Sequence, residues 1–201
     1  MSASYSINES QAEPSAVDIL SHPLGNSERI RLRYGSYGIN ILNNNTDFRI
    51  SSLYSTHDNV KTSRTIAVVA FQDINEQAFS KEHDAIINGQ SIGIVFKNNG
   101  WVIDKQHQFF GVIETPVHYF SESPPPAESG KTQSAIHVYS LMVRKAGLEF
   151  HYATIAEIHH PNFLQLSDLA GIYGSKFESH RNMTMEIADF LDVIESSLLA
   201  L

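Results

Sequence analysis

The sequence contains no cysteine, and this absence excludes three kinds of chemistry. A chain without thiols has no disulfide framework, no thiolate nucleophile and no zinc site built on cysteine. The sequence also lacks an apolar run of the ~18 residues that a membrane helix needs. Residues 1–16 have neither the basic start nor the apolar core of a signal peptide. We therefore expect a cytoplasmic protein without a membrane-spanning segment.

Positive charge is scarce as well. The 14 lysines and arginines face 22 aspartates and glutamates, which gives a formal net charge of −8. Nucleic-acid binding draws most of its affinity from a basic face, so we do not expect nucleic acid as a partner. A small anionic ligand remains compatible with this charge, because the local field in a pocket steers such a ligand.

The pattern of apolar residues divides the chain into three parts. Residues 1–16 are rich in serine and polar, and are expected to form a flexible leader. Residues 17–161 mix short β-like runs with helical stretches, and residues 162–201 follow a period of 3.6. We expect an α+β domain over 17–161, with about six mainly antiparallel strands and inserted helices, followed by a C-terminal helical extension.

The expected elements differ in how clearly the sequence marks them. A helix is expected to end near the glycines of 35–38, although arginines alternating with apolar residues there also suit a strand. Extended runs occur at 39–42, 48–54, 65–71, 102–103, 109–114, 135–144 and 148–159. The short connection 145–147 makes the last two runs the clearest hairpin. The prolines within 121–135 predict a loop.

Two arginines occur where a buried charge is unfavourable. Arg64 leads into the most apolar run, 65–71, and Arg49 lies on an earlier run. Strict alternation places Arg49 on a face with Ser51, and Arg64 on a face with Ile66. A charge on a buried strand must be paired or must face a cavity. Both arginines are therefore candidates for binding carboxylates, and surface ion pairs are the alternative.

An acidic residue near the end of the last run is the candidate general acid. Strict alternation over 148–159 assigns Phe150, Tyr152 and Ile158 to one face, and a second group to the other: His151, Ile155, Glu157 and His159. Burial of Glu157 would favour its protonated form, which can donate a proton. An exposed glutamate at a strand end is the alternative. His151 and Glu157 lie ~20 Å apart along a strand, so we expect no metal site there.

Four segments, taken in chain order, resemble the chorismate lyase family, whose fold also occurs in ligand-sensing domains of some bacterial repressors. They are Phe48-Arg49-Ile50, Ser63-Arg64-Thr65-Ile66, Gly89-Gln90-Ser91-Ile92-Gly93, and Thr154-Ile155-Ala156-Glu157-Ile158 with Pro161 after it. In the family, an arginine on a strand precedes an Arg-Thr strand, a helix with a glycine-containing turn follows, and a late hairpin strand carries a glutamate. Ser91 departs from the family pattern, which has proline there.

The resemblance implies an activity and a set of site residues. The lyase removes pyruvate from chorismate to give 4-hydroxybenzoate, and it needs no metal or cofactor. By position, Arg49 would bind a substrate carboxylate with Arg64 in support, and the backbone of Ile92 and Gly93 would contact the ligand. Glu157 would serve as the acid–base residue.

Two alternatives stay open beside a chorismate lyase-like enzyme. The chain is also compatible with a non-catalytic protein that binds or senses an aromatic acid. The last helix carries an apolar stripe from Met183 to Leu198, which suits either packing within the chain or a homodimer formed through the C-terminal helices.

Overall fold

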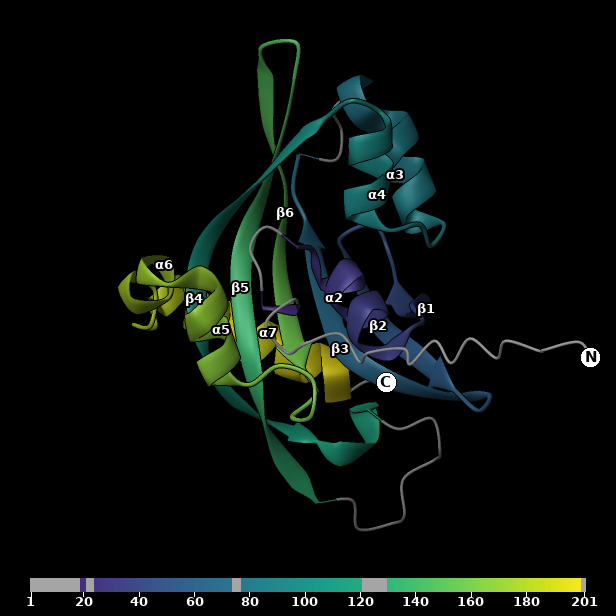
Figure 1. Cartoon of the computed structure of the whole chain (residues 1–201). Coiled ribbons are helices and arrows are strands. Elements are labelled where there is room, and N and C mark those ends of the chain that lie inside the picture. The colour runs from purple at the N-terminus through teal and green to yellow at the C-terminus, as the bar shows by residue number, and fades with distance from the viewer. Residues whose placement is uncertain (1–18, 21–23, 74–76, 121–129, 200–201) are drawn as a thin grey trace, which may run out of the picture.

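Six strands form one antiparallel sheet in the order β1-β2-β3-β6-β5-β4 (Figure 1). The computed structural model describes residues 19–20, 24–73, 77–120 and 130–199, so the expected leader at 1–16 and most of the expected loop at 121–135 lie outside the described residues. The strands are β1 (Gly38–Asn44), β2 (Phe48–His57), β3 (Val60–Phe71), β4 (Val102–Pro116), β5 (Lys131–Lys145) and β6 (Leu148–His159). The expected α+β class with an antiparallel sheet is confirmed.

Helices cover both faces of this sheet. One face carries α2 (Asn26–Tyr34), α3 (Ser80–Ile87), α4 (Ile92–Asn98), α5 (Leu166–Tyr173) and α6 (Ser175–Ser179), whereas α7 (Met185–Leu199) lies against the other face. Two short 3₁₀ helices, η1 (Gln77–Phe79) and η2 (Val117–Phe120), complete the described elements. We call the two surfaces the five-helix face and the α7 face. None of the helices in the described ranges is long and apolar enough to cross a membrane.

The hairpin expected at 135–159 is present, and its first strand already begins at Lys131, so the last residues of the loop expected at 121–135 belong to β5. Strands β5 and β6 pair from Ile136 opposite Ile158 to Lys145 opposite Leu148. The connecting residues Ala146 and Gly147 have positive φ angles of 52° and 80°. This left-handed pair matches the right-handed twist of the flanking strands, which is why two-residue turns of this kind close hairpins.

The runs expected at 102–103 and 109–114 belong to a single strand, β4. Its pairing with β5 passes from His107 opposite Tyr139 to Phe109 opposite Val138, which leaves Gln108 as an extra residue. Such a β-bulge lets a strand continue while its alternation shifts by one residue. The expectation of two separate runs was therefore wrong, because the apolar pattern breaks at the bulge although the strand does not.

The apolar stripe of the last helix packs against the sheet of its own chain. Ile187, Leu191 and Ile194 are buried on the α7 face in one cluster with Ile50 and Ile136. Met183, which was assigned to the same stripe, precedes α7 and is exposed. The sequence left two roles open for this stripe, packing within the chain or formation of a homodimer. Its buried members serve packing within the chain.

Truncating the centre of this stripe should destabilise the fold. We expect Ile194→Ala to lower the free energy of unfolding by about 2–4 kcal/mol, because it deletes a side chain with no solvent exposure. Urea denaturation measures the change. Val193→Ala is the matched control, since Val193 is exposed on the same helix and its truncation should change stability by less than about 0.5 kcal/mol. Equal effects of the two substitutions would contradict this packing.

Candidate functional site

Bulges decide which side chains reach the five-helix face. In β6, the pairing with β5 passes from Ala153 opposite Leu141 to His151 opposite Met142, so Tyr152 is the extra residue. Tyr152 consequently packs beneath α3 and α4 in one cluster with Ile155. Strict alternation placed Phe150 and Tyr152 on the face of Ile158, and it placed His151 on the face of Glu157. This expectation is wrong for residues 150–152, because the bulge shifts the alternation there. Ile158 lies in the cluster of the α7 face.

A second bulge turns Arg64 toward the five-helix face. The pairing of β2 with β3 passes from Leu53 opposite Thr65 to Tyr54 opposite Ser63, which leaves Arg64 unopposed. Its guanidinium donates from Nε to Ser55 Oγ at 2.9 Å and stacks over a tyrosine ring of α2. The expected sharing of a face by Arg64 and Ile66 is therefore wrong.

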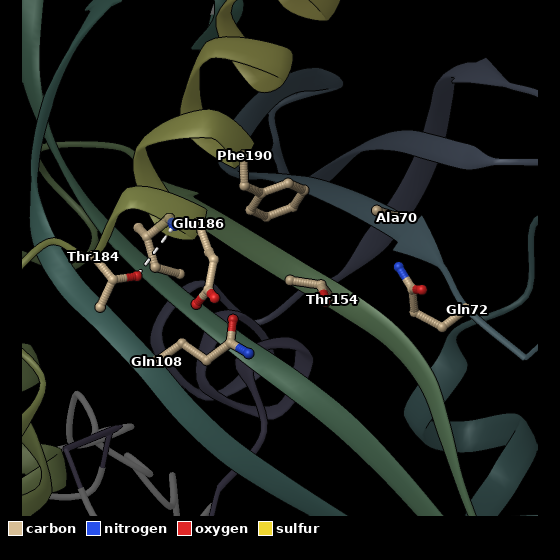
Figure 2. A pocket seen from close by; sticks show the side chains of 8 residues that line it. Ala70, Gln72, Gln108, Thr154, Thr184, Glu186 and Phe190 are labelled. Carbon is tan, nitrogen blue, oxygen red and sulfur yellow. Dashed lines mark hydrogen bonds between the residues drawn. The ribbon is translucent and has the colours of Figure 1, made fainter.

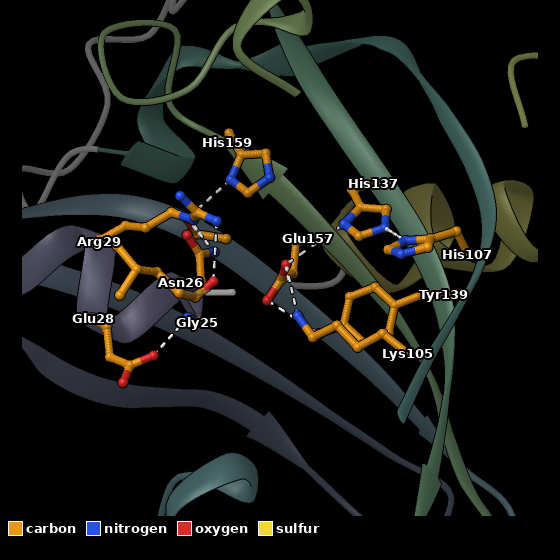
Figure 3. A network of polar contacts seen from close by, with 12 residues as sticks. Gly25, Asn26, Glu28, Arg29, Lys105, His107, His137, Tyr139, Glu157 and His159 are labelled. Carbon is orange, nitrogen blue, oxygen red and sulfur yellow. Dashed lines mark hydrogen bonds and ion pairs between the residues drawn. The ribbon is translucent and has the colours of Figure 1, made fainter. Parts of the chain in front are cut away.

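Glu157 lies at the centre of a buried polar network on the five-helix face (Figure 3). The residue is 7% exposed, and Lys105 Nζ approaches its Oε2 to 3.9 Å. The Tyr139 hydroxyl donates to its Oε1 at 3.2 Å, while His137 Nδ1 lies 4.0 Å from Oε2. A 2.8 Å contact joins His137 Nε2 to His107 Nδ1. We call these five residues the Glu157 network; β4, β5 and β6 supply them.

A second set of polar contacts borders the network from α2. His159, two residues beyond Glu157 on β6, has its Nδ1 3.2 Å from Thr65 Oγ1. Asn26 Nδ2 donates to the same hydroxyl at 3.0 Å. The Arg29 guanidinium is buried nearby and donates to the carbonyl oxygens of Ile19 and Leu24. Figure 3 shows these α2 residues beside the Glu157 network.

Arg49 joins the same face from β2, as the sequence predicted for a buried strand arginine. Its Nη1 donates to the carbonyl oxygens of Ile86 at 2.7 Å and Gln90 at 3.1 Å. The guanidinium is therefore held against the turn that leads into α4, where the predicted contacts Ile92 and Gly93 form the first helical turn. Residues 92–98 form this helix directly after the turn.

The register places Arg49 and Glu157 on one surface. Arg49 pairs with Val69, and Val69 pairs with Ile155, two residues before Glu157. Two strand spacings and two residues of rise put their Cα atoms about 12 Å apart. Tyr37 acts electrostatically on both side chains and bonds to the Ser91 side chain, so its hydroxyl lies in this same region. Arg49 and Glu157 are thus brought to one region, whereas Arg64 lies at the far end of α2.

Five buried polar atoms on this face have no hydrogen-bond partner within the described chain. They are Asn26 Oδ1, Arg49 Nε, Ser51 Oγ, His137 Nδ1 and His159 Nε2. Buried polar atoms in native proteins are nearly always hydrogen-bonded, so a group of unpaired atoms on one surface indicates a place for polar atoms from elsewhere. The group contains donors and acceptors, which suits a molecule with carboxylate and hydroxyl groups.

The buried charged residues on this face are two arginines, Arg29 and Arg49, and two glutamates, Glu82 and Glu157. Glu82 accepts a hydrogen bond from the Trp101 indole N–H, and the partly exposed Lys105 pairs with Glu157. The ion pairs of the described chain include neither Arg29 nor Arg49. Burial lowers the pKa of both guanidinium groups from the ordinary arginine value, although arginine remains protonated at neutral pH. Arg29 and Arg49 are therefore buried charges that no carboxylate of the described chain pairs with.

Burial also sets the protonation of the aromatic and imidazole groups. Desolvation, reinforced by Lys105 and by His107, lowers the pKa of His137 well below its ordinary value. Desolvation lowers the pKa of His159 to about 4, and it raises the pKa of Tyr139, with Glu157 adding to that rise. At neutral pH both histidines and the phenol are accordingly uncharged, so they act in the site as hydrogen-bonding groups.

Several residues of this region carried no usable sequence signal. Lys105 and His107 fall in a stretch where the apolar pattern of β4 is interrupted, and His137 lies in an otherwise apolar run. For His137, the one available signal was its position as a single histidine in an apolar strand. Arg29 alternates with apolar residues in α2, and this spacing is equally compatible with a helix and with a strand.

The α7 face has a hollow of a different kind. Its volume is about 410 Å³, and Figure 2 shows Gln108 and Glu186 approaching one another across it from β4 and α7. Its remaining lining residues are Ala70, Gln72, Thr154, Thr184, Ile187 and Phe190. These residues include Glu186 and no cation, so this hollow does not suit an organic anion.

No protein-family model matches this chain, and no curated protein matches it either. The resemblance to the chorismate lyase family therefore rests on the residues of the four matching segments.

The buried histidine His159 predicts a loss of stability in mild acid. Its pKa is about 4 in the folded protein against 6.5 for an unperturbed histidine, so the unfolded chain binds the proton more tightly. The free energy of unfolding should fall between pH 6.5 and pH 4 by roughly 3 kcal/mol at most from this residue, and His137 adds a change of the same sign. Urea denaturation at pH 7 and pH 5 measures the loss.

The matched substitutions are His159→Gln and His57→Gln. Glutamine at position 159 does not titrate, so the loss between pH 7 and pH 5 should shrink, whereas the exposed His57 should leave it unchanged. An undiminished loss in His159→Gln would rule out this residue as its source.

Proposed function

We propose that this protein binds a small organic anion with a carboxylated ring on its five-helix face and acts on it as a chorismate lyase-like enzyme in the cytoplasm. The observation that carries the proposal is the buried guanidinium of Arg49, which has no ion pair in the described chain and lies on a surface with five unpaired polar atoms, its own Nε among them. Arginine suits this role because its guanidinium contacts carboxylates through two parallel hydrogen bonds.

The arrangement gives Arg49 a positioning role. Two backbone carbonyl groups hold its Nη1, so the guanidinium is fixed in orientation before a ligand arrives, and its Nε has no protein partner. Fixed cations stabilise bound charge without reorganising, and exclusion of water strengthens the contact. Ile92 and Gly93 would then contact the ligand from the start of α4, beside the turn that Arg49 holds.

Glu157 suits the acid–base role. When pyruvate leaves chorismate, the ether bond to the ring breaks, the adjacent ring carbon loses its proton as the ring becomes aromatic, and the released enolpyruvate takes up a proton. Glu157 lies about 12 Å from Arg49 along the sheet, with Lys105 and Tyr139 against its two oxygens. A carboxylate so placed can accept and return a proton within a water-poor site.

The first test is turnover. Purified protein given chorismate without added metal should release 4-hydroxybenzoate and pyruvate in equal amounts, as measured by chromatography and a coupled pyruvate assay. Glu157→Gln should lower kcat by at least about 100-fold, because the amide cannot carry the proton, while binding of 4-hydroxybenzoate largely persists. Glu149→Gln is the control, since this glutamate of the same strand is exposed and pairs with Arg144. Full turnover in Glu157→Gln would reject the acid–base role.

The second test separates an enzyme from a sensor. We expect 4-hydroxybenzoate to raise the melting temperature of the protein, and Arg49→Gln to abolish the rise by removing the buried positive charge. Arg144→Gln, which alters an arginine at the surface, should retain it. A ligand-induced rise without consumption of chorismate would identify a binding or sensing protein, and a full rise in Arg49→Gln would exclude Arg49 as a ligand-binding residue.

A further inference from the structure

Arg64 is held on a tyrosine ring at the end of α2, outside the Glu157 network. Its Cζ lies 3.8 Å from the centroid of the Tyr34 ring, and Arg33 Cζ lies 5.6 Å from the same centroid. The Tyr34 hydroxyl donates to the carbonyl oxygen of Asn162 at 3.2 Å, which anchors the ring. Two guanidinium groups are thereby gathered around one aromatic side chain.

Each guanidinium is fixed at one edge by the protein. Arg64 donates from Nε to Ser55 Oγ at 2.9 Å, and Arg33 donates from Nη1 to the carbonyl oxygen of Phe163 at 2.6 Å. Both terminal nitrogens of Arg64, and the second terminal nitrogen of Arg33, have no hydrogen bond to the described chain. These donors are held in place because ring stacking and the bonds at the opposite edge restrict both side chains.

The two arginines repel one another without a neutralising carboxylate. The charge of Arg33 adds to desolvation in lowering the pKa of Arg64, and no acidic group is among the charges that raise it. The neighbouring His160 pairs with Arg64 through the backbone, and its ring lies against Phe120, a residue of the cluster on the α7 face.

Arg31 and Arg181 also lie over aromatic rings, each singly, so what distinguishes Arg33 and Arg64 is that both lie over one ring. Arg144 contacts Asp104 and Glu149, each at 2.9 Å. Arg29 and Arg49 are bound by backbone carbonyl groups in the interior. In a protein with a formal net charge of −8, two adjacent arginines with free donors and no carboxylate partner in the described chain form a local site of opposite character.

We propose that Arg33, Arg64 and Tyr34 form a binding site for a phosphate group. A phosphate dianion matches the two positive charges, and its oxygens accept the bidentate hydrogen bonds that guanidinium groups offer. A single carboxylate would neutralise one of the two charges. This site is separate from the proposed lyase site, because Arg64 lies over the Tyr34 ring beside Arg33, whereas the printed contacts of Glu157 are with Lys105, Tyr139 and His137.

Calorimetric titration of the full chain with inorganic phosphate at low ionic strength tests the proposal. We expect Arg64→Ala and Arg33→Ala each to weaken phosphate binding at least about tenfold. Arg64→Lys should weaken it less, because lysine keeps the positive charge but lacks the planar donors that form a bidentate hydrogen bond. Arg144→Ala is the matched control and should bind as the parent does. Equal weakening in Arg144→Ala, or unchanged binding in both alanine variants, would overturn the proposal.

Two further measurements sharpen the result. In the unsubstituted protein, phosphate should shift the NMR signals of the Arg33 and Arg64 Nε–H groups and leave that of Arg144 unchanged, which tests the site without a variant that might misfold. Benzoate should shift them at least about tenfold less at equal concentration. Equal shifts with benzoate, or no shift with phosphate, would overturn the assignment.

The source of the phosphate group is resolved by comparing ligands. Glycerol phosphate represents a soluble phosphate ester, and vesicles of phosphatidylcholine containing phosphatidic acid represent a lipid headgroup. Binding of either that is lost in Arg64→Ala supports the site and identifies the source, whereas binding of neither would overturn it. Glu157→Gln should bind phosphate normally, so a failure of the proposed lyase activity and a failure of this site are distinguishable.

Discussion

The pairing of Glu157 with Lys105 is the contact on which the interior of this protein depends. A carboxylate on a face largely closed to water is unfavourable unless a cation and hydrogen-bond donors surround it. Lys105 supplies the cation from β4, and the Tyr139 hydroxyl on β5 donates a hydrogen bond. The sheet must therefore hold β4, β5 and β6 in one register, because a slip by one residue would turn these side chains to the opposite face.

Three bulges give the five-helix face its composition. The extra residue at Gln108 directs His107 and Lys105 to the same face as Phe110, and the extra residue at Tyr152 places a large aromatic side chain under α3 and α4. The bulge at Arg64 turns a guanidinium toward α2. Without these insertions the same sequence would distribute its polar and aromatic side chains over both faces.

Four of the arginines occupy two different environments. Arg29 and Arg49 are buried and bound by backbone carbonyl groups, so their positions are set by the fold rather than by acidic partners. Arg33 and Arg64 are set by an aromatic ring near the surface. Arg49, Arg33 and Arg64 each keep unused donors on a guanidinium that other contacts hold in place, which is the arrangement that recognition of an anion needs. The two proposed anion sites are therefore compatible with an acidic chain.

The sequence by itself determined the α+β class, the hairpin of β5 and β6, and the placement of Arg49 and Glu157 on strands that become buried. Alternation and turn residues are local properties, so a single chain segment displays them. Only the tertiary structure decided which face each side chain occupies beyond a bulge, that β4 is continuous, and that Lys105, His107 and His137 surround Glu157. A bulge exists because of how two strands pair, and the residues of one strand do not record the register of its neighbour.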